Sequence, residues 1–154
     1  MKKTIKTEKV LEVFKIINTA KYTKMNDDDK VKAWKIARQL KPVATKFEED
    51  CKDAAEKFKT EIKDFDERLQ KAQKFEQAKK DNKDCEDMTS GEYAAFLYEF
   101  KKYQELVNKA IMEFAQKDVK IQFDTISDDA FGKLMSSNEW TMEQAMLVGD
   151  VICE

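Results

Sequence analysis

The chain has 154 residues, of which 39% are charged and 42% hydrophobic, with three glycines, one proline, no histidine and a net charge of -2. The apolar content excludes a wholly disordered chain, and the lack of histidine removes the commonest general base and metal ligand. The length predicts one domain, and the scarcity of Gly and Pro predicts long helices.

The first predicted helix covers residues 4–18, where apolar side chains recur at helical spacing. Residues 19–25 have no periodicity and predict a link. Asn26 is the expected N-cap of the next helix, because the three aspartates that follow it suit the positive end of a helix dipole.

The next helix contains Pro42, which removes a backbone donor and disfavours the helical conformation at the residue before it. Apolar residues nevertheless keep their helical phase on both sides of Pro42. We therefore predict one kinked helix over Asp27–Lys80, with two helices meeting at Pro42 as the alternative. Beyond the proline the apolar residues show an eleven-residue spacing; they are Phe47, Cys51, Ala54, Phe58, Ile62, Phe65 and Leu69.

The charged segment at residues 79–87 predicts a loop at the tip of a hairpin. Thr89 and Glu92 form a T-x-x-E capping box that predicts the start of a returning helix. The apolar residues of this helix alternate steps of three and four, which is the heptad pattern typical of coiled coils. They are Tyr93, Phe96, Phe100, Tyr103, Val107, Ala110 and Phe114.

The tail begins with alternating apolar residues over Val119–Phe123, which predict a short strand. Ser127 is the expected cap of a short helix, and Thr141 with Gln144 forms a capping box that opens a last helix. Chain geometry makes Lys3–Ile5 the nearest partner for the strand, with pairing within the chain or between chains left open.

These elements predict a mainly α fold: an elongated antiparallel helical hairpin with a compact head and at most one small two-stranded sheet. The head is expected to comprise residues 1–50 and 118–154, and the projecting arms about residues 51–117, within a single domain. Trp34 and Trp140 are expected to anchor the packing of the head.

No residue constellation predicts catalysis, a metal site or a cofactor. The acidic residues near Glu49 are expected to form a solvated helix face, and the glycines are too few for a phosphate-binding loop. Cys51 is expected to be a small core residue and Cys85 to be exposed among acidic neighbours, which disfavour a reactive thiolate. Three widely spaced cysteines predict neither a disulfide framework nor a zinc site, and they favour a cytoplasmic protein. The N-terminal segment lacks the uninterrupted apolar core of a signal peptide, and we expect no membrane partner.

Charge is distributed unevenly, because residues 1–42 hold twelve basic and five acidic residues whereas residues 118–154 hold two and eight. We favour the interpretation that these oppositely charged ends hold the head together. The alternative is nucleic-acid binding by the basic N-terminal region, whose twelve basic residues from Lys2 to Lys41 could contact phosphates. The first candidate phosphate contacts are Lys2, Lys3, Lys6 and Lys9.

Four apolar residues on the returning helix lie outside its main heptad positions and widen the apolar stripe. These candidates for contact with a protein partner, or with a second copy of the chain, are Leu97, Tyr98, Leu106 and Ile111. The sequence therefore favours a non-enzymatic interaction or assembly protein over a nucleic-acid-binding one.

The order of parts resembles that of small helical proteins of unknown function encoded by phages and prophages. The resemblance lies in a Lys-rich first helix (Lys2–Asn18), long charged arms (Glu48–Lys80 and Glu92–Lys117) and a closing strand-helix-helix tail (residues 119–154). It implies a partner-binding or assembly role and carries no functional residues over to this chain.

Overall fold

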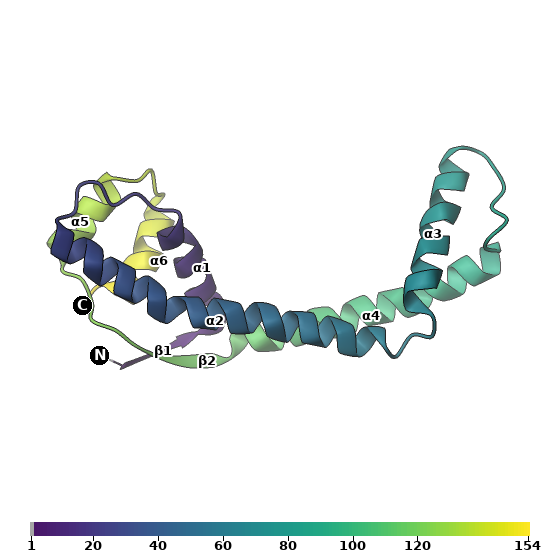
Figure 1. Ribbon diagram of the computed structural model, residues 1–154, viewed down its shortest axis with the longest axis horizontal. Helices are drawn as coiled ribbons and strands as arrows, with labels where there is room; N and C mark the ends of the chain where they lie inside the picture. Colours follow the sequence, from purple (N-terminus) through teal and green to yellow (C-terminus); the bar gives the residue numbers. More distant parts are fainter. Residues whose placement is uncertain (1) are drawn as a thin grey trace. The chain divides into compact units, whose positions relative to one another are not determined.

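The computed structural model describes residues 2–154 and contains, over that range, six helices and one two-stranded sheet (Figure 1). The predicted mainly α fold with one small sheet is confirmed. The elements are β1 (Lys2–Lys6), α1 (Thr7–Asn18), α2 (Asp27–Lys59), α3 (Phe65–Lys80), α4 (Ser90–Gln116), β2 (Asp118–Gln122), α5 (Asp128–Ser136) and α6 (Met142–Ile152).

The chain divides into two compact units. Unit 1 combines the chain up to Glu49 with Glu113–Glu154, and unit 2 is Asp50–Met112. Two helices, α2 and α4, contribute residues to both units.

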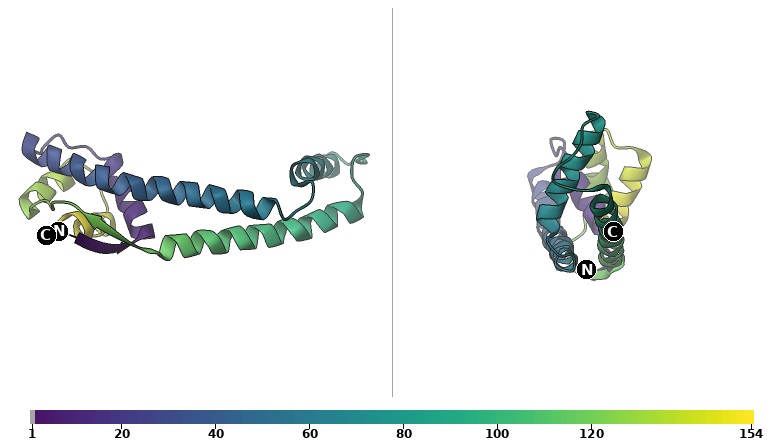
Figure 2. Two further views of the ribbon diagram at one scale, coloured as in Figure 1. Left: turned by 60° about the horizontal axis from the view of Figure 1, so that its bottom comes forward. Right: turned by 90° about the vertical axis from the view of Figure 1, so that its right-hand side faces the viewer.

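The sheet of unit 1 pairs β1 antiparallel with β2, so that Lys3 lies opposite Ile121 and Ile5 opposite Val119 (Figure 2). The predicted partnership of these segments is confirmed, and it forms within the chain. The predicted helix start at residue 4 is wrong, because residues 2–6 satisfy their backbone groups in the sheet. The helix begins at Thr7, whose N–H and hydroxyl both donate to the carbonyl of Lys117 at 2.9 and 2.8 Å.

The core of unit 1 lies where α1, α5 and α6 gather beside the N-terminal half of α2 (Figure 1). Each fully buried aliphatic side chain stabilises the fold by roughly 1.5–3 kcal/mol. The most deeply buried are Val10, Val13, Ile36, Leu40, Ile126, Leu134, Val148, Val151 and Ile152.

The two tryptophans differ in burial. Trp140 is half-buried against this core and lies 6.2 Å from the ring of Phe131, as expected of an anchor. The expectation for Trp34 is wrong, since its side chain is 57% exposed. The core positions of α2 are taken by smaller neighbours, chiefly Ile36 and Leu40, which leaves the indole on the opposite face.

The predicted helix caps in the unit are confirmed. The side chain of Asn26 accepts a hydrogen bond from the N–H of Asp29 at 2.8 Å, and Ser127 accepts one from Ala130 at 3.2 Å. Thr141 and Gln144 form both halves of their capping box. These bonds satisfy backbone donors that the first turn of a helix otherwise leaves unpaired.

Helix α2 passes through Pro42 without ending, so the alternative of two helices meeting there is wrong. The predicted continuation to Lys80 is also wrong, because α2 ends at Lys59 and α3 begins at Phe65. Directly after α2 the hydrogen bonds change to the tighter 3₁₀ pattern, because the N–H groups of Glu61 and Ile62 donate to carbonyls three residues back.

Asp64 completes the break by adopting a left-handed conformation, with φ 54° and ψ 41°. Asp tolerates this conformation better than most residues, so the chain turns without Gly or Pro. Apolar spacing did not reveal the break, because Ile62, Phe65 and Leu69 on both sides of it pack into one cluster.

That cluster is the core of unit 2, in which α3 crosses α4 at a steep angle and the loop at residues 81–89 joins the two helices (Figure 1). Phe65 at the start of α3 meets Tyr103 with ring centroids 5.1 Å apart, and Phe75 near its end stacks on Tyr93 at 4.4 Å. An ion pair between Arg68 and Glu99 also joins the two helices. Thr89 accepts the predicted cap bond from the N–H of Glu92 at 3.2 Å.

Replacing Pro42 with Ala tests the cost of proline inside α2. Pro42 is exposed, so the change loses no packing and restores a backbone donor for the carbonyl of Arg38. We expect Pro42→Ala to stabilise the protein by about 1–3 kcal/mol, measured by urea denaturation and by a raised Tm.

The matched control is Thr45→Ala, which changes another exposed position of the same helix. Its gain should stay below about 0.7 kcal/mol, the range of ordinary helix propensities. Equal effects of the two substitutions would show that Pro42 places no strain on α2.

Candidate interaction surfaces

Three lysines of the basic N-terminal region bind the carboxyl ends of helices in unit 1. Lys3 Nζ donates to the carbonyls of Val151 and Cys153 at 2.9 and 3.0 Å, at the end of α6. Lys6 Nζ donates to Gln116 at the end of α4, and Lys24 Nζ to Ser136 at the end of α5, both at 3.0 Å. The last carbonyls of a helix lack partners within it and carry the negative end of its dipole, so these ammonium groups stabilise three helix ends.

Ion pairs add to the same pattern. Lys6 lies 2.9 Å from Asp118 and Lys9 lies 3.4 Å from Asp150, all with exposed side chains. Each such pair contributes no more than about 1 kcal/mol. Of the four candidate phosphate contacts, Lys3, Lys6 and Lys9 therefore bind groups of the chain itself, and Lys2 is exposed on the sheet.

A second set of cations lies on the face of α2 that points away from the core. This α2 basic face comprises Lys30, Val31, Lys32, Trp34, Lys35, Arg38 and Lys41, all exposed. Within residues 2–154, no acidic side chain forms an ion pair with any of its five cations. The guanidinium of Arg38 lies over the ring of Trp34, 4.7 Å from its centroid.

Beside the α2 basic face lies an open groove with a volume of about 400 Å³. Three cations and Gln39 of α2 line the groove on one side. The last residue of β2 and the two residues after it line the other side. The lining residues are Lys32, Lys35, Arg38, Gln39, Gln122, Phe123 and Asp124.

The five cations of this surface belong to the basic N-terminal region that the sequence predicts as an alternative phosphate-binding region, but the exposure of Trp34 among them was missed. Residues 30–41 hold five basic residues and no acidic one. Val31, Trp34 and Arg38 are three and four residues apart, so they share one face of the helix. The buried Ala33 and Ile36 lie on another face. The assumption that a tryptophan is buried hid the pattern.

The four candidate partner contacts on α4 do not form one patch. Leu97, Tyr98 and Leu106 are exposed and Ile111 is half-buried. Leu97 and Leu106 are nine residues apart, so at about 100° per residue they lie on opposite flanks of the helix. Ile111 shares the flank of Leu97, about 20 Å further along. Tyr98 is 64% exposed and stacks with Lys102, whose Nζ lies 4.4 Å from the ring centroid.

The aromatic core of unit 2 is incompletely covered. Phe65, Phe75 and Phe96 are buried, but other members of the same cluster keep part of their surface in solvent. These half-buried members are Ile62, Leu69, Cys85, Tyr93, Phe100 and Tyr103. The leucine at position 97 extends this apolar surface on the flank of α4 that carries Tyr93 and Phe100.

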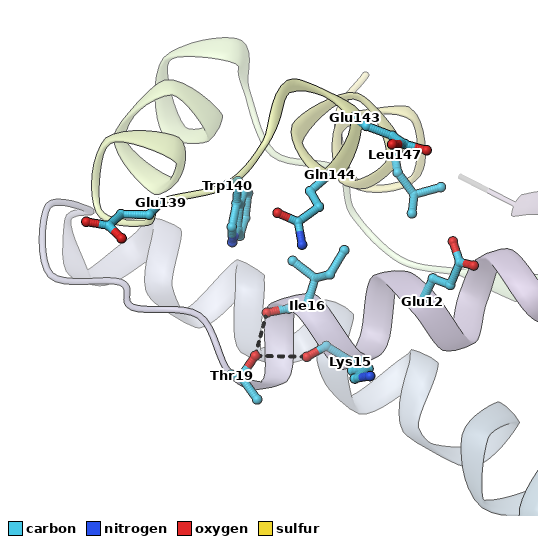
Figure 3. A pocket seen from close by; sticks show the side chains of 9 residues that line it. All are labelled: Glu12, Lys15, Ile16, Thr19, Glu139, Trp140, Glu143, Gln144 and Leu147. Carbon is cyan, nitrogen blue, oxygen red and sulfur yellow. Dashed lines mark hydrogen bonds between the residues drawn. The ribbon is translucent and has the colours of Figure 1, made fainter.

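A cleft of about 460 Å³ separates α1 from the start of α6 (Figure 3). Trp140 and Gln144 point towards α1, where Ile16 faces them, and Thr19 donates hydrogen bonds to the carbonyls of Lys15 and Ile16. Its charged lining consists of Lys15 and three carboxylates, from Glu12, Glu139 and Glu143. The described residues contain no group of three or more His, Cys, Asp or Glu placed to hold a metal ion.

The three cysteines are free thiols. Cys85 is half-buried against the core of unit 2, so the expectation that it is exposed is wrong: the loop folds over the aromatic cluster. Cys153 is buried, and burial raises its pKa to about 11, with Asp128 raising it further and Lys3 opposing. Burial, followed by the charge of Asp50, also raises the pKa of Cys51. The raised pKa values disfavour nucleophilic thiolates at both positions.

Within residues 2–154, no helix combines the length and the apolar character needed to cross a membrane. Comparison of the chain with protein-family models, with curated proteins and with solved structures finds no match in any of the three.

Replacing Lys3 with Met tests its role at the end of α6. The change keeps the aliphatic stem but removes both hydrogen bonds to the carbonyls of Val151 and Cys153. We expect a loss of about 1–3 kcal/mol in the free energy of unfolding, measured by urea denaturation. The control Lys2→Met changes the neighbouring exposed residue of β1, and its effect should stay within about 0.5 kcal/mol. A Lys3→Met effect as small as that of the control would contradict the assigned role.

Alkylation tests the burial and the raised pKa of Cys153. At pH 8, about three units below the pKa, about one thiol in a thousand is ionised. We expect iodoacetamide to leave Cys153 unmodified in the folded protein and to modify all three cysteines in urea, as mass spectrometry of peptides would show. Modification of Cys153 as fast as that of the loop residue Cys85 would contradict both the burial of Cys153 and its raised pKa.

Proposed function

We propose that this is a non-enzymatic protein-interaction or assembly protein that associates with further copies of itself through unit 2. The incompletely covered aromatic core of that unit carries the proposal. A unit of about 60 residues is close to the smallest size at which a single core stabilises a fold. Aromatic surface left in water at such a core is typical of a protein–protein contact.

Covering apolar surface stabilises an association by roughly 25 cal/mol per Å², before the entropy of association is subtracted. Phe100 and Tyr103 combine large half-exposed rings with restricted side-chain motion, and both belong to the contacts around Phe65. Rigid aromatic rings lose little conformational entropy on binding, which makes them effective contact residues.

The exposed Leu97 supports a contact on one flank of α4. It lies one turn after Tyr93 and beside Phe100 on the helix surface. Leu106 and Tyr98 lie elsewhere around the helix and are secondary candidates. A second copy is the simplest partner because it presents the same aromatic surface, and a two-fold dimer needs only one self-complementary patch.

We also propose a cellular compartment and a biological origin for the protein. Three free thiols, with no disulfide among them, support a reducing cytoplasm. The architectural resemblance to small phage and prophage proteins supports an assembly role in a phage or another mobile element.

Sedimentation equilibrium over about 1–200 µM protein tests self-association. We expect a monomer–dimer equilibrium and a Tm that rises with protein concentration. Leu97→Glu places a charge in the proposed contact and should raise the dimer Kd at least tenfold. The matched control is Ala95→Glu, which adds the same charge on the opposite, exposed side of α4 and should leave the Kd unchanged.

A monomer at every concentration, with a constant Tm, would refute self-association. An equal effect of Leu97→Glu and Ala95→Glu would remove this flank of α4 from the contact. Circular dichroism of each variant separates a lost contact from a lost fold.

A further inference from the structure

We propose that the α2 basic face binds single-stranded nucleic acid, with phosphates on its lysines and a base stacked on Trp34. This surface belongs to unit 1, and the inference does not depend on self-association through unit 2. It moves the candidate phosphate contacts from the first residues of the chain to the exposed side of a helix.

The cations of this face take no part in the ion pairs described for residues 2–154. Lys3, Lys6, Lys9 and Lys24 bind helix carbonyls or carboxylates of unit 1. The five cations of the α2 basic face have no such partners among residues 2–154. At 1.5 Å per residue they cover about 16 Å of helix, a length over which several phosphates of an extended strand fit. Asp27, Asp28 and Asp29 precede these cations on α2, so residues 27–41 keep a net charge of +2, which is complementary to a polyanion.

Trp34 gives the surface a binding feature besides charge. Its ring is 57% exposed, and Val31 beside it is 49% exposed, so neither side chain is needed to complete the core. Arg38 covers one face of the indole at 4.7 Å and holds the ring against the helix. A largely exposed indole offers a surface on which a base can stack, and base stacking contributes to single-strand binding with little regard to sequence.

The neighbouring groove supplies hydrogen-bonding groups. The exposed amides of Gln39 and Gln122 can each donate to and accept from the edge of a base. Asp124 repels phosphate, but its carboxylate accepts hydrogen bonds from exocyclic amino groups. The groove therefore suits a base, with the backbone of the strand following the lysines.

Three other polyanionic partners fit less well. A membrane-bound helix needs a whole apolar face, but that face of α2 lies in the core of unit 1 around Ile36 and Leu40. A DNA duplex keeps its bases stacked away from Trp34, and a single arginine offers little for reading the major groove. Acidic protein segments would use the lysines but not the stacking surface.

The test uses fluorescence anisotropy of a labelled 20-nucleotide oligothymidylate, with the full chain titrated at 50–300 mM KCl. We expect binding whose log K falls with log[KCl] with a slope of about -3.5, as five phosphate contacts to a single strand predict. In the Trp140→Phe background the remaining indole is Trp34, and its fluorescence should be quenched on binding.

Variants separate the contribution of charge to binding from the contribution of base stacking. Lys35→Glu combined with Arg38→Glu should weaken binding more than tenfold and flatten the salt slope. Trp34→Ala should weaken binding about tenfold with the slope retained, and Trp34→Phe should restore most of the affinity. The matched control is Lys101→Glu with Lys109→Glu, which changes net charge equally at exposed positions of unit 2 and should keep at least half of the affinity.

Four results would overturn the proposal. They are no binding at 50 mM KCl, an equal loss in the control variant, tighter binding to a duplex of the same length, and unchanged affinity in Trp34→Ala. Binding to phosphatidylserine vesicles but not to the oligonucleotide would assign the surface to a membrane instead. The Leu97→Glu variant should bind the oligonucleotide with unchanged affinity per chain, so failure here is distinguishable from failure of self-association.

Discussion

Strand β1 brings the first residues of the chain beside the segment that follows α4, and the arrangement of unit 1 depends on this contact. Its pairing with β2 places Lys3 at the end of α6 and Lys6 at the end of α4. A two-stranded sheet is marginal by itself, but here the lysines and the hydrogen bonds of Thr7 to Lys117 reinforce it. Sequence-distant ends are thus joined by backbone bonds and by charge at helix termini.

The same arrangement divides the basic residues into two groups with different roles. Lys3, Lys6 and Lys24 stabilise the ends of helices in unit 1. The cations on α2 lie on the far side of a helix whose other face is buried, and they form no ion pair among the described residues. The net charge of the whole chain is near zero and does not reveal the two groups of basic residues. The acidic tail offsets the charge of the N-terminal lysines, whereas the cations on α2 remain exposed.

Unit 2 is held together by the packing of aromatic rings rather than by lysines at helix ends. Its core is a cluster of aromatic rings around Phe65 and Phe96, held between two helices with the loop at Cys85 folded over it. Two helices and a loop cannot surround so many large rings, and several remain half-exposed. The incomplete burial is a geometric consequence of the small unit, and it makes a covering partner favourable.

The sequence by itself determined that the chain is mainly helical and where several helices begin, because helix starts depend on local spacing and on single polar side chains such as Asn26, Ser127 and Thr141. It identified the two strand segments that pair, from the order of the elements along the chain. It also indicated that the basic and acidic ends of the chain meet. Only the tertiary structure decided where α2 ends, since Asp64 turns the chain while the apolar phase continues through Ile62 and Phe65. Burial likewise depends on which neighbours fill a core, so the exposure of Trp34 and the division of the lysines between helix ends and an open surface became visible only in the folded chain.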